Sequence, residues 1–483
     1  MILEPGWQAP QYLWNTKKYP SVPNLISTLN ETGTQLILWE HPILDLAAPL
    51  TALLRKSGCI AGHEPAPRGT NNAFTDLTLP KCQNLWKQFQ LANVIKQGAK
   101  GFKLDEDDVD MNIGFVDDTV FPSGMTGAFF HNIQGYILQR IFHEMYESIG
   151  QRTWLQSRGN FAGGQAYPTN SYSDGYTYST YVRGVVNSGF SGLIWAPELR
   201  QATCDADFAR RSQLMFMSPQ AQYNAWNSPE PKARPWECTG SGLNSSTWTS
   251  FKKHYDLRKG LATYLYSAFE AQGRTGLPLA RALVMDSPED SHTWSVDDQF
   301  LIGASLMFAP AGMDKPKSTS VVRSVYFPPT ATSWHPWFAN ATKYTPGRVT
   351  SVPSPILDAP LFVKGGSVVP FQRPGSEEHV LELVVFAPAT CTDGIAWSSV
   401  YDDDGETTRY KTQGEHWRGR AGYACNATHH ALHFEVVHAT FATQWSAVRW
   451  RLHHHHGGAL GTEELPPMPI GPAAAVHVVR RWE

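Results

Sequence analysis

Over roughly the first 300 residues, stretches with helical spacing of apolar residues alternate with short runs that are apolar throughout. The clearest helix is Phe130–Ile149, because its apolar residues recur every three or four positions and Gly150 follows it. Further helices are predicted at Val22–Thr32, at Gln83–Gln97 and near Leu257–Ala271. Strands are predicted at Met1–Glu4, Gln35–Trp39, Gly101–Leu104, Arg152–Gln156, Gly192–Trp195, Ala282–Met285 and just before Asp174. This alternation predicts parallel βαβ units.

Polar and acidic residues stand at the carboxyl ends of these predicted strands. They are Glu40, His41, Asp105, Glu106, Ser157, Arg158, Ser173, Asp174, Glu198 and Asp286. In a (β/α)8 barrel the chemistry gathers at every strand's carboxyl end, whereas a doubly wound sheet binds ligands only at a switch point. The pattern therefore favours a TIM-type barrel. Only about six clear strands occur where a closed barrel has eight, so we expect its first strands to be missing.

After about residue 310 the helical spacing stops, and β-rich runs such as SVVRSVYF and LELVVFAP alternate with Pro/Gly turns. This texture is typical of antiparallel β-sandwiches. We predict an α/β chain with an incomplete catalytic barrel at 1–308, a proximal β-sandwich at 309–377 and a distal β-sandwich at 378–483. The segment His453–Pro472, with four consecutive His, is expected to be a flexible loop rather than a metal site.

Composition narrows the class of partner. The 483 residues are 42% hydrophobic and 17% charged, with a formal net charge of −3, which argues against nucleic acid or an anionic membrane as the main partner. No apolar run is long enough to span a membrane, and the start, MILEPGWQAPQYLW, does not resemble a signal peptide. The chain has six Cys without a CxxC pair, so no zinc site is expected. N-x-S/T sequons occur at Asn30, Asn244, Asn340 and Asn426. The even Cys count and the sequons suit a secreted or lysosome-like location.

Asp105 follows a predicted strand directly, within the segment GFKLDEDDVD. This acidic segment could be a solvated loop or a cation site, although the spacing does not fit an EF-hand. Alternatively, Asp105 is a nucleophile at the strand tip, and the positive charge of Lys103 helps to keep it ionised.

Asp174 stands in the segment NSYSDGY, where it could be a turn residue before Gly175 or a proton donor. Retaining glycoside hydrolysis needs a nucleophilic carboxylate and an acid/base carboxylate roughly 5–5.5 Å apart, which two strand tips on one barrel rim can provide. Tyr172 and Tyr176 could supply the partly dry surroundings that raise the pKa of the donor.

Other strand ends carry side chains that could line a sugar pocket. Arg158 either forms a structural ion pair or holds sugar hydroxyls or a catalytic carboxylate, and Trp195 either packs in the core or forms a pocket wall. The side chains predicted to bind substrate are Trp39, Lys103, Arg158, Tyr172, Trp195, Glu198 and Asp286. A serine hydrolase is excluded because the chain has no G-x-S-x-G elbow. Dinucleotide binding is unsupported because no G-x-G-x-x-G motif follows a predicted strand.

Several of these segments together resemble glycoside hydrolase family 31. GFKLDE resembles the family's nucleophile strand, SRGNFAGGQAYP followed by YSDGY resembles the region leading to the acid/base, and NSGFSGLIWAPELR resembles the next strand. WSVDDQFLIGASLMFAP, PLFVKGGSVVPF and YDDDGET resemble the end of the barrel and the C-terminal sandwiches. The resemblance runs from about Trp7 to about Tyr410, and it implies Asp105 as nucleophile and Asp174 as acid/base. It also implies a longer chain, with an N-terminal sandwich and further barrel strands.

Departures from the family pattern bear on the sugar. Asp174 is flanked by Ser and Gly, where α-glucosidases have Gly and Asn, and Gln165 and Met285 replace an Arg and a His of those enzymes. The motifs KLDE, YSD and W-x-P-E-x-R are closer to the branch with α-galactosidases and α-N-acetylgalactosaminidases, although Thr177–Thr180 replaces that branch's charged run.

The sequence thus predicts a retaining exo-α-glycosidase that acts on an oligosaccharide or glycoside, with α-galactosides as the favoured substrate and no metal or organic cofactor. An α-glucosidase, α-xylosidase or α-N-acetylgalactosaminidase is the alternative within the family. The alternative of another class is a non-catalytic carbohydrate-binding homologue or an inactive fragment. The sequence leaves the oligomeric state and the pairing of the cysteines open.

Overall fold

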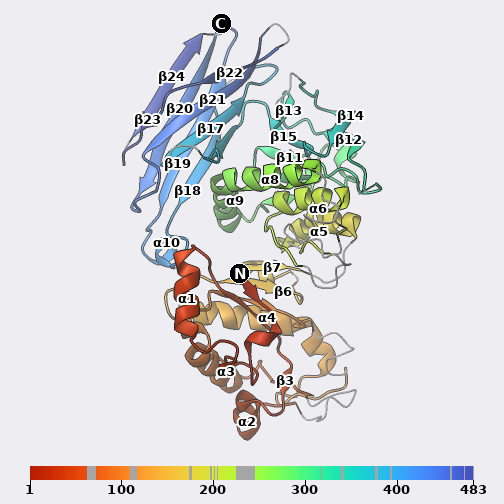
Figure 1. Cartoon of the computed structure of the whole chain (residues 1–483), viewed down its shortest axis with the longest axis vertical. Helices are drawn as coiled ribbons and strands as arrows, with labels where there is room; N and C mark the ends of the chain where they lie inside the picture. The colour runs from red at the N-terminus through yellow and green to blue at the C-terminus, as the bar shows by residue number, and fades with distance from the viewer. Residues whose placement is uncertain are drawn as a thin grey trace. The chain divides into compact units, whose positions relative to one another are not determined.

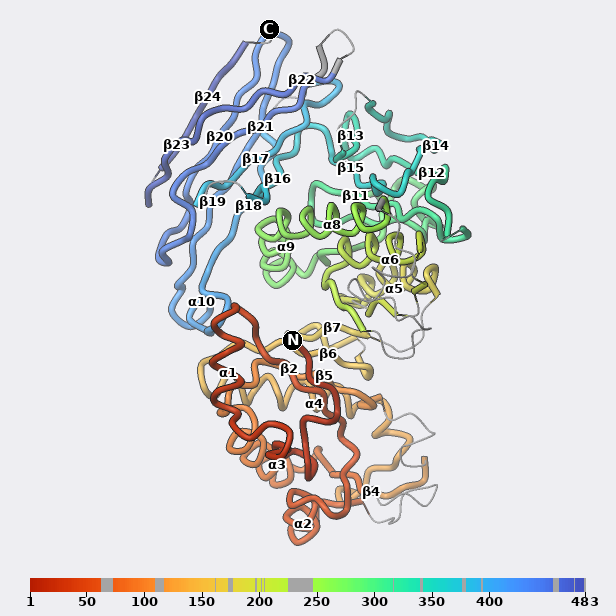
Figure 2. The backbone as a smooth tube through the Cα atoms, viewed as in Figure 1, coloured from red at the N-terminus to blue at the C-terminus, as the bar shows by residue number. Residues whose placement is uncertain are grey.

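The structure is a computed structural model of the 483-residue chain (Figures 1 and 2). It describes residues 1–61, 72–108, 117–160, 162–172, 177–195, 198–200, 202–203, 205–224, 245–315, 317–338, 342–375, 379–391, 394–456, 459–472 and 474–481. The predicted proton donor Asp174 and its neighbour Tyr176 lie outside these residues. Contacts divide the chain into an N-terminal unit, Met1–Tyr172 with Gly405–Arg409, and a C-terminal unit, Ser173–Asp404 with Tyr410–Glu483.

The N-terminal unit is built on a parallel sheet. Its strands are β1 (Ile2–Leu3), β2 (Ile37–Glu40), β5 (Gly101–Leu104), β6 (Trp154–Ser157) and β7 (Thr169–Ser171), in the order β1-β2-β5-β6-β7. Glu40, Leu104 and Ser157 are aligned across β2, β5 and β6. The residues that follow these three strands therefore leave the sheet at the same level, which brings their side chains together.

Helices share one apolar core with this sheet. They are α1 (Val22–Glu31), α2 (Pro49–Lys56), α3 (Pro80–Asn93) and α4 (Gly127–Glu147), with the 3-10 turns η1 (Pro5–Trp7), η2 (Ile95–Gln97) and η3 (Gly164–Ala166) and the short strand pair β3 (Leu44–Asp45) and β4 (Asn72–Ala73). The helices predicted for this part are confirmed, each with slightly different ends. Phe102 of β5 packs on Phe142 of α4 with ring centroids 4.6 Å apart. A disulfide joins Cys59, beyond α2, to Cys82 of α3.

The C-terminal unit begins with further helices. They are α5 (Tyr178–Ser188), α6 (Ala206–Met217), α8 (Ser245–Gly260) and α9 (Ala262–Thr275), with the turns η4 (Gly189–Ser191), η5 (Leu283–Met285) and η6 (Ser291–Thr293) and the strand β8 (Ile194–Trp195). The helix expected near Leu257–Ala271 is two helices that meet at Leu261. The strand predicted at Ala282–Met285 is wrong: β9 is Ala280–Arg281, and a 3-10 turn follows it.

The rest of this unit, as far as the structure describes it, consists of sheets whose neighbouring strands are antiparallel, except for one parallel pair between β17 (Val380–Phe386) and β21 (Ala447–His456). One sheet has the order β13-β15-β11-β10-β9, with β10 (Phe300–Ile302), β11 (Leu306–Phe308), β13 (Trp334–Pro336) and β15 (Leu361–Lys364). The strands β12 (Ser320–Phe327) and β14 (Arg348–Pro355) form a separate pair.

Two larger sheets share a core that includes Leu383 and Trp450 of one and Tyr423 and Phe434 of the other. The first contains β16 (Val368–Phe371), β17 (Val380–Phe386), β21 (Ala447–His456), β22 (Ala459–Glu464) and β23 (Met468–Pro469). The second contains β18 (Ala396–Asp402), β19 (Trp417–Cys425), β20 (His429–Ala439) and β24 (Ala475–Arg481), and the short helix α10 (Arg409–Thr412) lies between β18 and β19 in the chain. A disulfide joins Cys391 to Cys425.

The flexible loop predicted at His453–Pro472 is wrong, because this segment forms most of the antiparallel pair β21–β22. His453 is buried, and its ring stacks on Phe386 with centroids 4.5 Å apart. Its carbonyl also accepts a hydrogen bond of 2.7 Å from the amide of Ala387. The composition of this His-rich segment alone predicts a linker. In the structure, the ring contact with Phe386 and the pairing of β21 with β22 place the segment in a sheet.

Candidate active site

Asp105 lies directly beyond β5, where the sheet of the N-terminal unit ends. All four residues of β5 are buried. The amide of Asp105 donates a hydrogen bond of 2.8 Å to the carbonyl of Glu40 on β2. The backbone of Asp105 is thereby fixed against the neighbouring strand, and its side chain starts from a rigid position.

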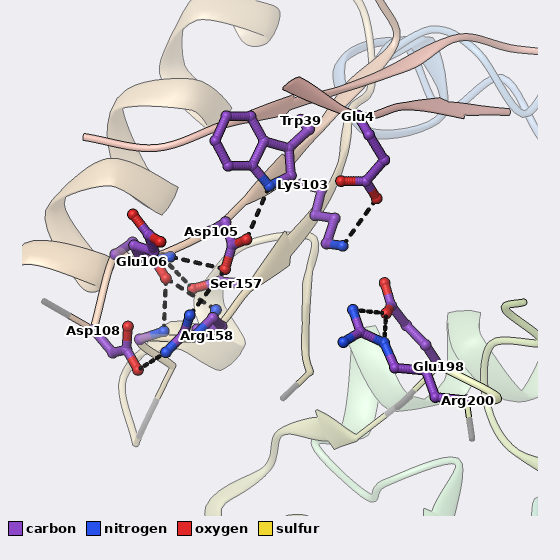
Figure 3. A network of polar contacts seen from close by, with 12 residues as sticks. Glu4, Trp39, Lys103, Asp105, Glu106, Asp108, Ser157, Arg158, Glu198 and Arg200 are labelled. Atoms are coloured by element: carbon purple, nitrogen blue, oxygen red, sulfur yellow. Dashed lines mark hydrogen bonds and ion pairs between the residues drawn. The ribbon is translucent and has the colours of Figure 1, made fainter. Parts of the chain in front are cut away.

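Three donors from different segments hold the carboxylate of Asp105 (Figure 3). The indole Nε1 of Trp39 donates to Oδ2 over 2.9 Å. The guanidinium Nη1 of Arg158 donates to Oδ1 over 3.1 Å, and the amide of Glu106 donates to the same oxygen over 3.0 Å. Arg158, predicted either to hold a carboxylate or to form a structural ion pair, here holds the predicted nucleophile.

These contacts keep Asp105 ionised. Burial by itself would raise the pKa of this carboxyl. The hydrogen bond from Trp39 and the hydroxyl of Tyr172, together with the positive charges of Lys103 and Arg158, outweigh burial and lower the pKa of Asp105 below the ordinary value. The side chain of Asp105 keeps 16% of its surface exposed, so it is neither fully enclosed nor a solvated loop carboxylate.

Lys103 and Tyr172 complete the surroundings of Asp105. Lys103 is only 2% exposed, and its Nζ lies 3.2 Å from Oε1 of Glu4 and 5.1 Å from the centre of the Tyr172 ring. Five side chains predicted from the sequence to act in one site, Trp39, Lys103, Asp105, Arg158 and Tyr172, are therefore gathered within the N-terminal unit. Their roles toward a substrate stay predictions.

The acidic residues after Asp105 differ sharply from one another. Asp108 is partly exposed and accepts a hydrogen bond of 3.2 Å from Nη2 of Arg158. Asp107 is fully buried, and burial raises its pKa to about 7. It accepts hydrogen bonds from the amides of Arg158 and Gly159 and from the hydroxyl of Ser157. Nothing in the sequence distinguishes Asp107 from its acidic neighbours except its place in an acidic run next to a strand end.

A second residue not assigned a role from the sequence is His41, beyond β2. Its ring lies 4.9 Å from the ring of Trp39 between centroids. Burial lowers the pKa of His41 to about 4, although the negative charge of Asp105 opposes this. His41 is therefore neutral near pH 7 and supports Trp39 as a packed ring.

The remaining predicted substrate-binding residues belong to the C-terminal unit and are already engaged there. Glu198 is completely buried, and it accepts hydrogen bonds from Arg200, Gln222 and Asn224. Figure 3 shows the Glu198–Arg200 pair. Trp195 packs so closely on α5 that a Cβ at Gly184 would lie 2.3 Å from its Nε1.

Asp286 forms a two-pronged ion pair with Arg281, with hydrogen bonds of 2.6 and 2.8 Å, and lies 3.6 Å from Nζ of Lys364. Burial opposes the charge of Asp286, but Arg281 and Lys364 lower its pKa. For Asp286, Glu198 and Trp195 the structure supplies a packing or ion-pair role, while contact with a substrate stays a prediction.

A buried, ionised carboxylate with donors on both oxygens suits nucleophilic attack on an electrophilic carbon. Among the described residues, no group of three or more His, Cys, Asp or Glu side chains is placed to hold a metal ion. Within the same residues, no helix is both long and apolar enough to cross a membrane.

Comparison with known families gives two matches in succession along the chain. Residues 1–268 match the family model described as the TIM-barrel domain of the glycosyl hydrolases family 31, and residues 276–369 match the model of the family's C-terminal domain. These matches, with the parallel sheet followed by antiparallel sheets, confirm the predicted fold class of a TIM-type barrel and C-terminal β domains.

Individual proteins agree with these matches. The α-xylosidase of Emericella nidulans is 24% identical over 403 residues, which is 79% of this chain and 50% of that protein. A solved α-xylosidase of Xanthomonas citri superposes with a TM-score of 0.83 at 19% identity, covering 99% of this chain and 55% of the other. A dextranase of Flavobacterium johnsoniae, solved with isomaltotriose, gives a TM-score of 0.79 at 19% identity, covering 94% and 59%. The chain thus spans about half the length of these proteins.

Proposed function

Because this chain belongs to glycosyl hydrolase family 31, we propose that it is a retaining exo-acting α-glycosidase with Asp105 as nucleophile and Asp174 as acid/base. The observation that carries the proposal is the site around Asp105, which lies inside the matched barrel domain. Its carboxylate is kept ionised by Trp39, Tyr172, Lys103 and Arg158 at a point where the strands of a barrel carry their chemistry.

The proposed reaction has two displacement steps. In the first, an oxygen of Asp105 attacks the anomeric carbon and forms a glycosyl ester, while Asp174 gives its proton to the glycosidic oxygen that leaves. In the second, Asp174 takes a proton from water, the water oxygen attacks the same carbon, and the ester bond to Asp105 breaks. The donors on Asp105 help by fixing the direction of attack and by keeping the carboxylate deprotonated between turnovers.

The proposed substrate is a terminal α-galactoside of an oligosaccharide or glycoside. The sequence motifs KLDE, YSD and W-x-P-E-x-R support this choice. An α-xyloside is the second candidate, because both the relative from Emericella nidulans and the structural neighbour from Xanthomonas citri carry the name α-xylosidase.

Four nitrophenyl glycosides test the proposal: the α-galactoside, α-xyloside, α-glucoside and N-acetyl-α-galactosaminide. We expect the α-galactoside to be hydrolysed fastest. Proton NMR during the first minutes should show the α-anomer of the released sugar, because two inversions restore the configuration. A β-anomer as first product would contradict the double displacement. Hydrolysis of none of the four would contradict the proposed activity and support a non-catalytic homologue.

We further propose that the chain works in an oxidising compartment such as the secretory pathway or a lysosome. The disulfides Cys59–Cys82 and Cys391–Cys425 support this, because such bonds persist where thiols are not kept reduced. Endoglycosidase treatment of material expressed in a eukaryotic secretory host would test the sequons at Asn30 and Asn426 by a shift in mass.

A further inference from the structure

We propose that Asp107 is a positioning residue: it clamps the chain beyond β6 in the place from which Arg158 reaches Asp105. The expected effect of Asp107 on catalysis rests on the proposed function. Its effect on the pKa of Asp105 does not, and can be measured separately.

The carboxylate of Asp107 gathers three donors from consecutive residues. Its Oδ1 accepts the amide of Arg158 over 2.9 Å and the amide of Gly159 over 2.7 Å. Its Oδ2 accepts the hydroxyl of Ser157. Because Asp107 is fully buried, water does not replace these bonds when one is lost. The backbone on both sides of the Arg158 Cα is therefore tied to one side chain.

Helix α4 holds the same segment from the other side. Gln139 of α4 donates to the hydroxyl oxygen of Ser157 over 2.9 Å and to the carbonyl of Gly159 over 3.3 Å. The packing leaves no room for a side chain: a Cβ at Gly159 would lie 2.7 Å from the carbonyl oxygen of Asp107, and a Cβ at Gly135 2.0 Å from that of Gly159. The segment is thus confined between α4 and the chain around Asp107.

The clamp determines what the Arg158 side chain can reach. With its backbone held, Arg158 spans from Oδ1 of Asp105 to Oδ2 of Asp108, over 3.1 and 3.2 Å. Without the clamp, an arginine has several rotatable bonds with which to leave Asp105 and follow the more exposed Asp108. No hydrogen bond described above joins Asp107 to Asp105. Apart from the repulsion between their charges, Asp107 therefore acts on Asp105 through Arg158.

The protonation of Asp107 suggests which substitution can replace it. Burial raises its pKa to about 7, and the negative charges of Asp105 and Asp108 add to this, while hydrogen bonds from Ser157 and Gly159 oppose it. Arg158 is the cation of this group, paired to Asp105 and Asp108. A neutral side chain of the same shape should therefore keep most of the clamp, because an Asn oxygen accepts the same two amides, and only the hydroxyl of Ser157 loses its acceptor.

The test compares Asp107→Ala and Asp107→Asn with wild type and with Asp118→Asn. Asp118 is an exposed acid of the same unit and serves as the matched control. In the full chain, we expect kcat on the preferred nitrophenyl α-glycoside to fall about 100-fold in Asp107→Ala, with a smaller change in KM, because a misdirected nucleophile loses orientation. The kcat of Asp107→Asn should stay within about tenfold of the wild-type value, and the kcat of Asp118→Asn should equal the wild-type value.

Carbon-13 NMR of the aspartate carboxyl groups supplies a readout that needs no activity. Asp107→Ala should raise the pKa of Asp105, because Arg158 no longer holds its carboxylate. Loss of a neighbouring negative charge alone would lower that pKa, so the direction separates the two explanations.

An unchanged or lowered pKa of Asp105 in Asp107→Ala would overturn the proposal, as would wild-type kcat in that variant. If Asp107→Ala does not fold, a 100-fold loss of kcat in folded Asp107→Asn overturns it, because the charge rather than the clamp would then matter. If wild type hydrolyses no glycoside, the proposed function fails, and the titration of Asp105 still decides the role of Asp107.

Discussion

Asp105 and Asp286 are two carboxylates near strand ends, one in each unit, and both have a lowered pKa although burial opposes their charge. Asp286 is held mainly by one guanidinium, that of Arg281 five residues earlier, which bonds to both of its oxygens, and the ammonium group of Lys364 lies 3.6 Å away. Asp105 is held by side chains from two other strand ends, the indole of Trp39 on one oxygen and the guanidinium of Arg158 on the other, with the amide of Glu106 also on the second oxygen.

The difference shows that a depressed pKa alone does not identify a catalytic carboxylate. Structural ion pairs lower the pKa of an acid as effectively as an active site does. The bidentate pair of Asp286 with Arg281 stabilises a short local segment of the chain. The donors to Asp105 come from separate strand ends and fix the orientation of its side chain. The two sites should therefore respond differently to the loss of the carboxylate charge.

The largest expected effect is on turnover in Asp105→Asn. An amide cannot form the glycosyl ester, so kcat on the preferred aryl α-glycoside should fall by at least about 10³-fold. The far-ultraviolet circular dichroism spectrum should match that of wild type, because Asn keeps the size of the side chain. Asp286→Asn is the matched control in the other unit. Full activity of Asp105→Asn would contradict the proposed role of Asp105 as nucleophile, and Asp105 would then be an ion-paired carboxylate like Asp286.

The second effect, on stability, should appear at Asp286. Asp286→Ala leaves the guanidinium of Arg281, which is 3% exposed, without its carboxylate partner. Removing one partner of such a buried pair should cost about 3 kcal/mol of unfolding free energy, measured by urea denaturation. The corresponding cost in Asp105→Asn should be smaller, because Arg158 keeps its contact with Asp108. An unchanged urea midpoint with lost turnover would instead assign Asp286 to the substrate.

The smallest effect concerns pH. Trp39→Phe removes the indole donor to Oδ2 of Asp105, so the pKa of Asp105 should rise. Attack requires the ionised form, and activity is lost as the pH falls through this pKa; the acid limb of kcat/KM should therefore move to higher pH. Loss of one hydrogen bond to a charged group predicts a shift of roughly one pH unit. An acid limb at the wild-type position would show that Trp39 does not tune Asp105.

Much of the site followed from the sequence because parallel strands have a simple geometry. Once Gly101–Leu104 was predicted as a strand, the residues beyond it and its neighbours had to meet at one edge of the sheet. Trp39, Lys103, Asp105 and Arg158 could thus be expected to lie together, and the ordered motifs favour Asp105 over the other acids of its run as the nucleophile.

Other features depend on contacts that no local pattern encodes. The role of Asp107 comes from amides about fifty residues away, and Glu198 is paired with Arg200 but also with residues beyond α6. The strand that contains His453 packs the ring of His453 on that of Phe386 in β17. A short apolar run such as Ala282–Met285 has no periodicity that distinguishes a strand from a 3-10 turn, and in the 3-10 turn only Leu283 is buried.

The segment Gly405–Arg409 has a consequence for biosynthesis. It belongs to the N-terminal unit: the amide of Arg152 donates to the carbonyl of Glu406 over 2.8 Å, and Gln151 pairs with Thr407. During translation, more than 200 residues after Tyr172 are therefore synthesised before Gly405–Arg409 can join this unit. Until then the backbone at Gln151 and Arg152 lacks these two partners, and unpaired backbone of this kind in a partly synthesised chain favours non-native association.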